Sequence, residues 1–165
     1  MMDSASHSSQ STTGLQKKIL IVDDDAGLRR IISILLERLG YSTVSAVNAE
    51  SALQEASRQK FDAVLLDVVL PDKNGPEIIT ELRGLCPDVE IIMITGDART
   101  DTAVKSLNAG ASAFLYKPLN NNELAAVLQE RLEHQNLKIE NRNLIEKLAR
   151  SETLFRSIFD SAAVG

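Results

Sequence analysis

Five short apolar runs alternate with five segments of helical character along most of the chain. Strand-length apolar runs separated by amphipathic helices are typical of a parallel sheet, because parallel neighbours need a crossover connection. These crossovers are right-handed and place helices on both faces of the sheet. The pattern therefore predicts an α/β fold with a doubly wound, five-stranded parallel sheet. The predicted strands cover residues 18–22, 41–46, 61–66, 89–94 and 112–116, and the helices cover about 26–39, 49–58, 76–85 and 99–109, with a last helix beginning near Asn120.

Both ends of the chain differ from this alternating core. The chain has 165 residues, of which 44% are apolar, so it can bury one complete core and has residues to spare. Residues 1–16 are rich in Ser and Thr and have almost nothing to bury, which predicts a disordered tail. The last helix does not stop where the sheet should end, because residues 124–152 contain neither Gly nor Pro and consist largely of helix formers. We therefore expect a long C-terminal helical extension.

The extension carries apolar residues at a spacing near seven. With Leu137 and Leu144 at heptad position d, position a is occupied by Val127, His134, Asn141, Leu148 and Phe155. This seam predicts a coiled coil with polar interruptions, through which two copies of the chain could form a homodimer. The alternative is a solvated helix whose surface carries paired charges.

Charge, hydropathy and cysteine content argue against several classes of protein. The net charge is −5 and the isoelectric point is about 5.1, with no basic stripe, which disfavours nucleic acid as a partner. No apolar run is as long as a membrane-spanning helix, and the amino terminus lacks the apolar core of a signal peptide. We therefore expect a cytoplasmic protein without a membrane partner. Cys86 is the single cysteine, so neither an intramolecular disulfide nor a cysteine-ligated metal is expected.

Polar residues stand at the ends of four predicted strands. Asp23 and Asp24 follow the first strand, Asp67 the third, Thr95 the fourth and Lys117 the fifth. The carboxyl ends of parallel strands line up along one edge of the sheet, where α/β proteins place their sites. We therefore expect these side chains to converge.

The residue types favour metal-assisted phosphoryl chemistry. Adjacent carboxylates are costly to bury unless a cation neutralises them, and oxygen ligands of this kind suit Mg²⁺ or Mn²⁺. An ionised Asp67 can act as a nucleophile and form an acyl phosphate. Lys117 would pair with the added phosphoryl charge, and the Thr95 hydroxyl would donate a hydrogen bond to it. A simpler role, capping the following helix, accounts for one of the acids at 23–25 but not for all three.

Four stretches resemble the receiver domain of two-component response regulators: KKILIVDDDAGLRR, LLDVVLPDKNG, IIMITGDA and GASAFLYKP. The resemblance covers about residues 17–134 and implies a flavodoxin-like fold. It also implies that Asp67 is the phosphoacceptor, that Asp24 binds Mg²⁺ directly, and that Asp23 acts mainly through water. The backbone carbonyl of Val69 would be a further Mg²⁺ ligand.

The same resemblance implies partners and a conformational switch. A histidine kinase, a phosphotransfer protein or a small phosphodonor would supply the phosphoryl group, and Thr95 and Lys117 would hold it. Thr95 would then move toward the phosphoryl group and Phe114 would turn into the space vacated, changing the face formed by the fourth helix, fifth strand and fifth helix. A cis peptide bond is expected before Pro118. The signal would pass to an output domain in the same or another chain, so the chain would not be an enzyme acting on an external substrate.

Residues 151–165 resemble the opening of a PAS sensory domain, which often begins with a Ser-Glu-x-x-Phe-Arg-x-x-Phe pattern. Residues 135–150 would then be a helical or coiled-coil linker between the receiver and the next domain. The alternative is that the helix simply continues.

A haloacid dehalogenase-like phosphohydrolase is the main competing function, since such enzymes also use an aspartyl nucleophile with Mg²⁺ on an α/β sheet. They carry a second acid two residues after the nucleophile, and Val69 occupies that position. A dinucleotide site is disfavoured as well, because the G-x-G-x-x-G fingerprint is absent. The sequence therefore favours the receiver.

Overall fold

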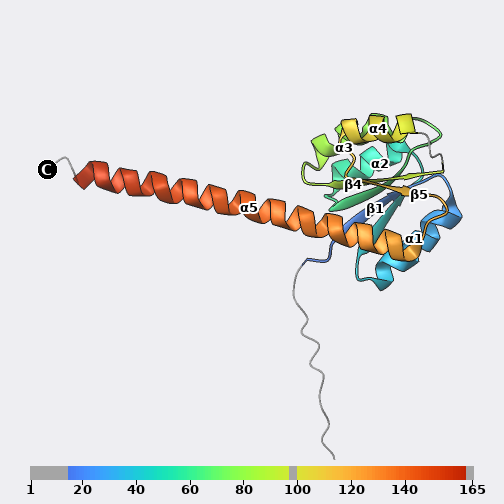
Figure 1. Cartoon of the computed structure of the whole chain (residues 1–165), viewed down its shortest axis with the longest axis horizontal. Coiled ribbons are helices and arrows are strands. Elements are labelled where there is room, and N and C mark those ends of the chain that lie inside the picture. The colour runs from blue at the N-terminus through green and yellow to red at the C-terminus, as the bar shows by residue number, and fades with distance from the viewer. Residues whose placement is uncertain (1–14, 97–99, 163–165) are drawn as a thin grey trace, which may run out of the picture.

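The computed structural model describes residues 15–96 and 100–162, and the predicted disordered tail lies almost entirely outside them. Its strands form one parallel sheet in the order β2-β1-β3-β4-β5, and Figure 1 shows this sheet between its covering helices. The strands are β1 (Lys18–Val22), β2 (Ser42–Ala46), β3 (Ala63–Asp67), β4 (Glu90–Thr95) and β5 (Ala113–Tyr116). The predicted five-stranded parallel sheet is confirmed.

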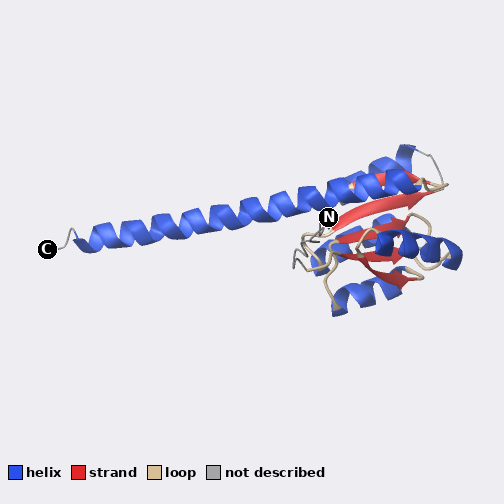
Figure 2. Ribbon diagram, turned by 90° about the horizontal axis from the view of Figure 1, so that it is seen from below, coloured by secondary structure: helices blue, strands red, loops and turns tan. Residues whose placement is uncertain are grey.

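Helices cover both faces of this sheet, which confirms the doubly wound, three-layer architecture (Figures 1 and 2). They are α1 (Ala26–Arg38), α2 (Ala49–Arg58), α3 (Gly75–Leu85), α4 (Thr100–Ala109) and α5 (Asn121–Ala162). Helices α2, α3 and α4 cover one face, and α1 and α5 cover the other. The side chains of β1 alternate between the two faces of the sheet, so this strand contributes to the hydrophobic core on each face. Leu20 packs in the core under α2, α3 and α4, and Ile21 packs in the core under α1 and α5.

Several strands differ from their predicted bounds by one or two residues. The third strand was expected at 61–66, but Phe61 and Asp62 precede β3, where Asp62 accepts the Lys18 backbone N–H through its side chain at 2.8 Å. At their other ends β3 and β4 continue one residue further than expected, to Asp67 and Thr95. Both residues therefore belong to the sheet itself, and this fixes their backbones more firmly than a loop would.

Helix α5 is a single helix from Asn121 to Ala162 that projects well beyond the sheet (Figures 1 and 2). The long C-terminal helical extension is thus confirmed. Its first turns pack on the domain through Leu124, Leu128 and Leu132, which are all buried. The described part of residues 151–165 continues the same helix without a break. Within the described residues, no helix has both the length and the apolar character needed to cross a membrane.

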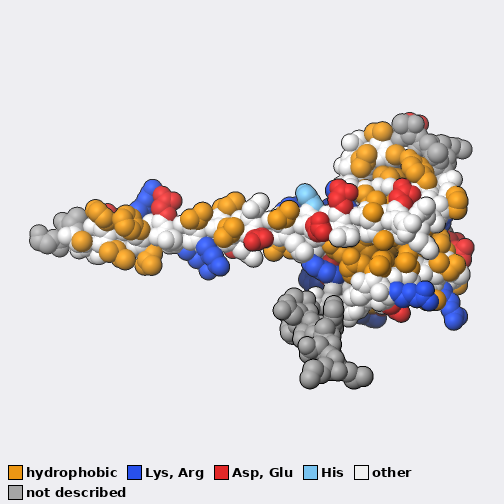
Figure 3. Space-filling view, turned by 60° about the horizontal axis from the view of Figure 1, so that its bottom comes forward, with side chains coloured by type: hydrophobic (Ala, Val, Ile, Leu, Met, Phe, Trp, Pro, Cys, Tyr) orange, Lys and Arg blue, Asp and Glu red, His pale blue; other side chains and the backbone are white. Residues whose placement is uncertain are grey.

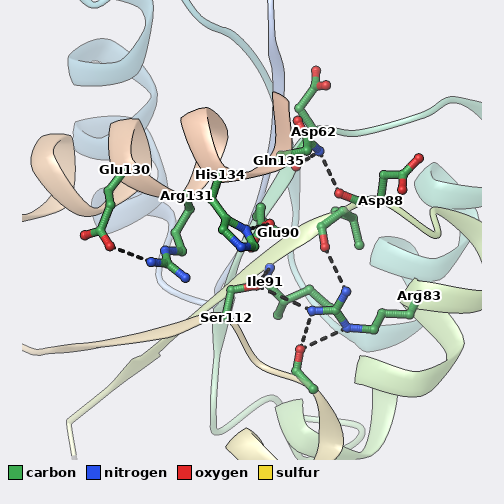
Figure 4. Close-up of polar contacts among 12 residues, drawn as sticks. Asp62, Arg83, Asp88, Glu90, Ile91, Ser112, Glu130, Arg131, His134 and Gln135 are labelled. Carbon is green, nitrogen blue, oxygen red and sulfur yellow. Dashed lines mark hydrogen bonds and ion pairs between the residues drawn. The ribbon is translucent and has the colours of Figure 1, made fainter. Parts of the chain in front are cut away.

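Polar contacts fasten α5 to the edge of the sheet where the strands begin. The Gln135 side chain is buried, and its Nε2 donates to the backbone carbonyls of Asp62 at 2.9 Å and Asp88 at 2.7 Å (Figure 4). Lys17 Nζ donates to Gln135 Oε1 at 3.1 Å, and the Arg142 guanidinium contacts both oxygens of Asp88 at 2.9 and 3.0 Å. The hydrogen bonds from Arg142 hold the pKa of the Asp88 carboxyl below its ordinary value. We call Lys17, Asp62, Asp88, Gln135 and Arg142 the base clamp.

Replacing Gln135 with alanine should destabilise the fold by about 1–3 kcal/mol, because a buried side chain and its two hydrogen bonds are lost: the part-buried Asp88 carbonyl loses its Gln135 donor, and the Asp62 carbonyl keeps only the Glu90 N–H. The matched control is Asn136→Ala, which removes one exposed contact with Lys17 and should change the free energy of unfolding by less than about 0.5 kcal/mol. Urea denaturation of both variants measures the difference. If both substitutions changed the free energy of unfolding equally, the buried contacts of Gln135 would contribute no more stability than the exposed contact of Asn136.

Candidate functional site

The structure gathers the predicted polar residues at the carboxyl edge of the sheet. Asp23 follows β1, Asp67 ends β3, Thr95 ends β4 and Lys117 follows β5. One carboxylate oxygen from each of Asp23, Asp24 and Asp67 lies within 4.8 Å of the others. The cluster lies where β1 and β3 are neighbours and the chain order along the sheet reverses, which is the ligand-binding position of open α/β sheets.

Lys117 joins two of these acids. Its Nζ lies 2.9 Å from Asp23 Oδ2 and 2.9 Å from Asp67 Oδ2, and both carboxylates are almost fully buried. The other oxygens also have donors: Asp23 Oδ1 accepts the Asp25 backbone N–H at 2.8 Å, and Asp67 Oδ1 accepts that of Val69 at 3.0 Å. The buried negative charge is thus compensated by one cation and by backbone dipoles.

The three consecutive acids have different positions. Asp25 caps α1, because its side chain accepts the Leu28 backbone N–H at 3.0 Å. Asp23 is buried beside Lys117, whereas Asp24 is exposed at the edge of the cluster. One acid of the three is therefore explained by capping, as the sequence predicted, and the other two face the cluster.

Burial and neighbouring charges perturb the groups in this cluster. Burial raises the pKa of Asp67, and the Asp23 charge adds to the rise, while the hydrogen bonds from Lys117 and Val69 oppose it. Burial alone would lower the pKa of Lys117, but its hydrogen bonds to Asp67 and Asp23 outweigh this and raise it. Lys117 therefore stays cationic at neutral pH, and Asp67 is held in a site that penalises its ionised form.

The raised pKa of Asp67 gives a testable dependence of stability on pH. A carboxyl whose pKa is higher in the folded state stabilises the fold below its unfolded-state pKa, and this contribution is lost as pH rises through the folded-state value. Asp67→Asn should therefore raise the midpoint of thermal unfolding at pH 7, without divalent cations, by a few degrees. Asp101→Asn, at an exposed acid in the first turn of α4, is the control and should not raise the midpoint, because an acid at this end of a helix is mildly stabilising. A midpoint lowered by Asp67→Asn would contradict this reasoning.

The remaining predicted residues lie around the cluster. Thr95 is buried, and its backbone carbonyl accepts the Lys117 N–H at 2.8 Å, which holds the ends of β4 and β5 together. Val69 is largely exposed and pairs with Asn74 across the loop after β3. Phe114 lies on β5 and packs, partly buried, against the core that α2 and α3 share. The expected cis bond between Lys117 and Pro118 is present.

Two contacts that support the site were not foreseen from the sequence. A Cβ atom on Gly75 would lie 2.3 Å from the Asp67 backbone oxygen, so the start of α3 sits directly against the end of β3. Arg29 Nη1 donates to the Asp23 backbone oxygen at 2.6 Å and ties α1 to the first acid. In the sequence, Gly75 follows a Pro-Asp-Lys-Asn stretch that is typical of a turn and says nothing of β3, and no local pattern links Arg29 to Asp23.

The donor set suits a hard divalent cation. The cluster offers three carboxylates, two buried and one exposed, and Mg²⁺ typically uses one or two carboxylates and keeps several waters. The exposed side at Asp24 leaves room for those waters. The cluster therefore fits Mg²⁺ or Mn²⁺ by residue type and placement.

A family model described as "Response regulator receiver domain" matches residues 19–129, which is more than half of the chain. The chain belongs to the response regulator receiver family. This confirms the resemblance seen in the sequence, and it does not favour the haloacid dehalogenase alternative. The matched range lies inside the predicted receiver, 17–134.

Named relatives and solved structures agree with this assignment. The transcriptional regulatory protein ZraR of Klebsiella oxytoca is 35% identical over 125 residues, covering 76% of this chain and 28% of the relative. A CheY-like receiver domain protein from Methanospirillum hungatei JF-1 superposes with a TM-score of 0.72 at 36% identity, covering 74% of this chain and 98% of that one. A Burkholderia pseudomallei response regulator with a phosphorylated aspartic acid, a calcium ion and citrate has a TM-score of 0.67 at 32% identity, covering 74% and 72%.

The curated relatives are much longer than the region they share with this chain. The chain spans between about a quarter and about a third of the length of these curated relatives. They are regulators in which the receiver forms one part of a larger protein.

Proposed function

We propose that this chain accepts a phosphoryl group on Asp67, with Mg²⁺ bound by the adjacent acids, and uses the modification to control an output domain. The observation that carries the proposal is the placement of Asp67. Its carboxylate is buried between Asp23 and the Lys117 ammonium at the carboxyl edge of a receiver-family sheet. A buried acid next to one cation and two further acids is unusual unless it serves chemistry.

The proposed reaction is a phosphoryl transfer with Asp67 as nucleophile. A carboxylate oxygen of Asp67 bonds to phosphorus, while the bond from phosphorus to the donor nitrogen or oxygen breaks and its electron pair leaves with the donor. Asp23, Asp24, Asp67 and the Val69 carbonyl would hold Mg²⁺, which when bound neutralises charge on the transferring group. The donor is a histidine kinase, a phosphotransfer protein or a small acyl phosphate.

The chain's own residues would stabilise the product. Lys117 already lies 2.9 Å from Asp67 Oδ2 and is placed to exchange this contact for one with a phosphoryl oxygen. The Thr95 hydroxyl would donate to another phosphoryl oxygen from the neighbouring strand. Phe114, on the strand beside Thr95, would then repack, and the change would appear on the face formed by α4, β5 and α5.

The output would lie beyond the receiver. Residues 17–134 would form the signalling unit and 135–150 a helical linker. Residues 151–165 would be the opening of a PAS domain, which begins on the same helix as the linker, and the output would lie in the same or another chain. The chain would not turn over an external substrate, since its chemistry is limited to gaining and losing its own phosphoryl group. We propose a cytoplasmic location, which is consistent with the response regulator family to which the receiver belongs. Nucleic acid and membrane are not proposed as partners of this receiver.

Incubation with Mg²⁺ and acetyl phosphate followed by intact mass measurement tests the proposal. The wild-type chain should gain the mass of one phosphoryl group, Asp67→Ala should gain none, and a chelator should abolish the gain. The control Asp101→Ala, at an exposed acid on α4, should be labelled like the wild type. Equal labelling of the Asp67→Ala variant would reject the assignment.

A further inference from the structure

The projecting part of α5 carries a stripe of exposed apolar side chains. Every described residue after Ile139 is exposed. Between Leu137 and Phe159, eight large hydrophobic side chains are between 51% and 70% exposed: Leu137, Leu144, Ile145, Leu148, Leu154, Phe155, Ile158 and Phe159. Figure 3 shows hydrophobic side chains along this arm, densest toward its far end. Isolated exposed hydrophobic residues are ordinary, but a continuous series along one helix marks an interaction surface.

The receiver domain contacts the opposite side of α5, so it cannot cover this stripe. The base clamp contacts α5 through Gln135 and Arg142. Leu144 lies nine residues after Gln135, which is two and a half turns at 3.6 residues per turn, so the two side chains point in opposite directions. Leu137 and Leu148 lie within about 40° of Leu144 around the axis.

We propose that the stripe binds a second copy of this chain, as a parallel, in-register, two-stranded coiled coil from Leu137 to Ile158. The seam would hold Leu137, Leu144, Ser151 and Ile158 at position d and Asn141, Leu148 and Phe155 at position a. The inference goes beyond the phosphoacceptor function, because it depends on the surface of α5 and not on Asp67.

The charges beside the seam match a parallel partner. In such a pair, position g of one helix lies beside position e of the next heptad in the other. Within the coil, Lys147 would face Glu152 of the second copy, a pair of opposite sign, and Glu140 would face the apolar Ile145. Leu154 would face Phe159, which places apolar side chains together where the stripe is densest.

Asn141 and the position of the receivers also favour this register. In the parallel pair Asn141 meets its own counterpart, an arrangement that specifies two strands in register. Because the clamp is on the opposite side of α5, the two receivers would lie outside the pair. The arm leaves at the amino edge of the sheet, so the acid cluster at the carboxyl edge would stay open to a phosphodonor.

Two adjacent substitutions test for the pairing. Leu148 and Ala149 are both exposed on α5, but only Leu148 lies in the seam. Sedimentation analysis of the 165-residue chain should show a dimer for the wild type, with a dissociation constant at least roughly 100-fold higher for Leu148→Asp and within about threefold of wild type for Ala149→Asp. A wild-type monomer at all concentrations, or a dimer insensitive to Leu148→Asp, would overturn the proposal.

Charge reversal and cross-linking test the orientation. Lys147→Glu and Glu152→Lys should each weaken the dimer, because each places like charges at positions 147 and 152 of facing helices. The double variant should restore the dimer, because these positions then carry opposite charges again with the signs exchanged. In an antiparallel pair position g would face position g, so Lys147 and Glu152 would not meet and the double variant would not recover what either single variant lost. Ser151→Cys should form a disulfide with itself under mild oxidation, since the native Cys86 is buried. A dimer that neither cross-links at 151 nor recovers in the double variant would overturn the parallel register.

Discussion

Replacing Lys117 with glutamine should lower the rate of phosphoryl uptake by roughly 100-fold or more, because it removes a donor placed where negative charge develops. Lys117 Nζ is the side-chain cation that contacts both Asp23 and Asp67 among the described residues. Without it the two carboxylates lose a shared ion pair and the local charge becomes more negative. Mg²⁺ affinity should therefore be retained or rise several-fold, so the substitution separates metal binding from chemistry.

Calorimetric titration with Mg²⁺ and intact mass after timed exposure to acetyl phosphate measure the two effects separately. The matched control is Lys73→Gln, which removes a half-exposed lysine from the loop after β3 and an ion pair with Glu81. It should leave uptake within about twofold of wild type. Uptake at the wild-type rate by Lys117→Gln would show that the lysine only neutralises the resting site.

The sheet and the site edge could be predicted from the sequence because both follow from local patterns. Parallel strands buried on both faces appear as continuous apolar runs such as ILIV and AVLL, and glycines follow the first and fourth helices. Once the strands are parallel, residues at their carboxyl ends must share an edge. The convergence of Asp23, Asp67 and Lys117 therefore required no knowledge of tertiary contacts.

The base clamp could not be predicted in this way. Gln135 bonds to the Asp62 backbone 73 residues away, and Lys17 bonds to Gln135 across 118 residues. In sequence Gln135 is one polar residue among many on a solvated helix. Its burial depends on where α5 crosses the amino ends of the strands. The packing of Leu124, Leu128 and Leu132 on the sheet sets this position.

Gly75→Ala should destabilise the fold by about 3 kcal/mol and slow phosphoryl uptake as well. Its Cβ would lie 2.3 Å from the Asp67 backbone oxygen and 3.0 Å from Met93 Cε. The methionine tip can move, but the oxygen belongs to the strand that carries the acceptor. The Gly75 N–H also donates to the Val68 carbonyl at 2.8 Å, so α3 cannot retreat without breaking that bond. Relief of the clash must therefore displace the backbone of Asp67 itself.

Helix α3 contains its own control at Gly84, where an added Cβ meets nothing within 4 Å. Gly84→Ala should stabilise the protein by about 0.5–1 kcal/mol, because alanine has the better helix propensity and less backbone entropy to lose. Urea denaturation compares the two variants, and labelling by acetyl phosphate shows whether the acceptor has moved. If Gly75→Ala were as stable as Gly84→Ala and were labelled normally, the contact between α3 and the end of β3 would not fix the position of the Asp67 backbone. A loss of both properties at Gly75 alone would show that this contact places the Asp67 carboxylate against Lys117.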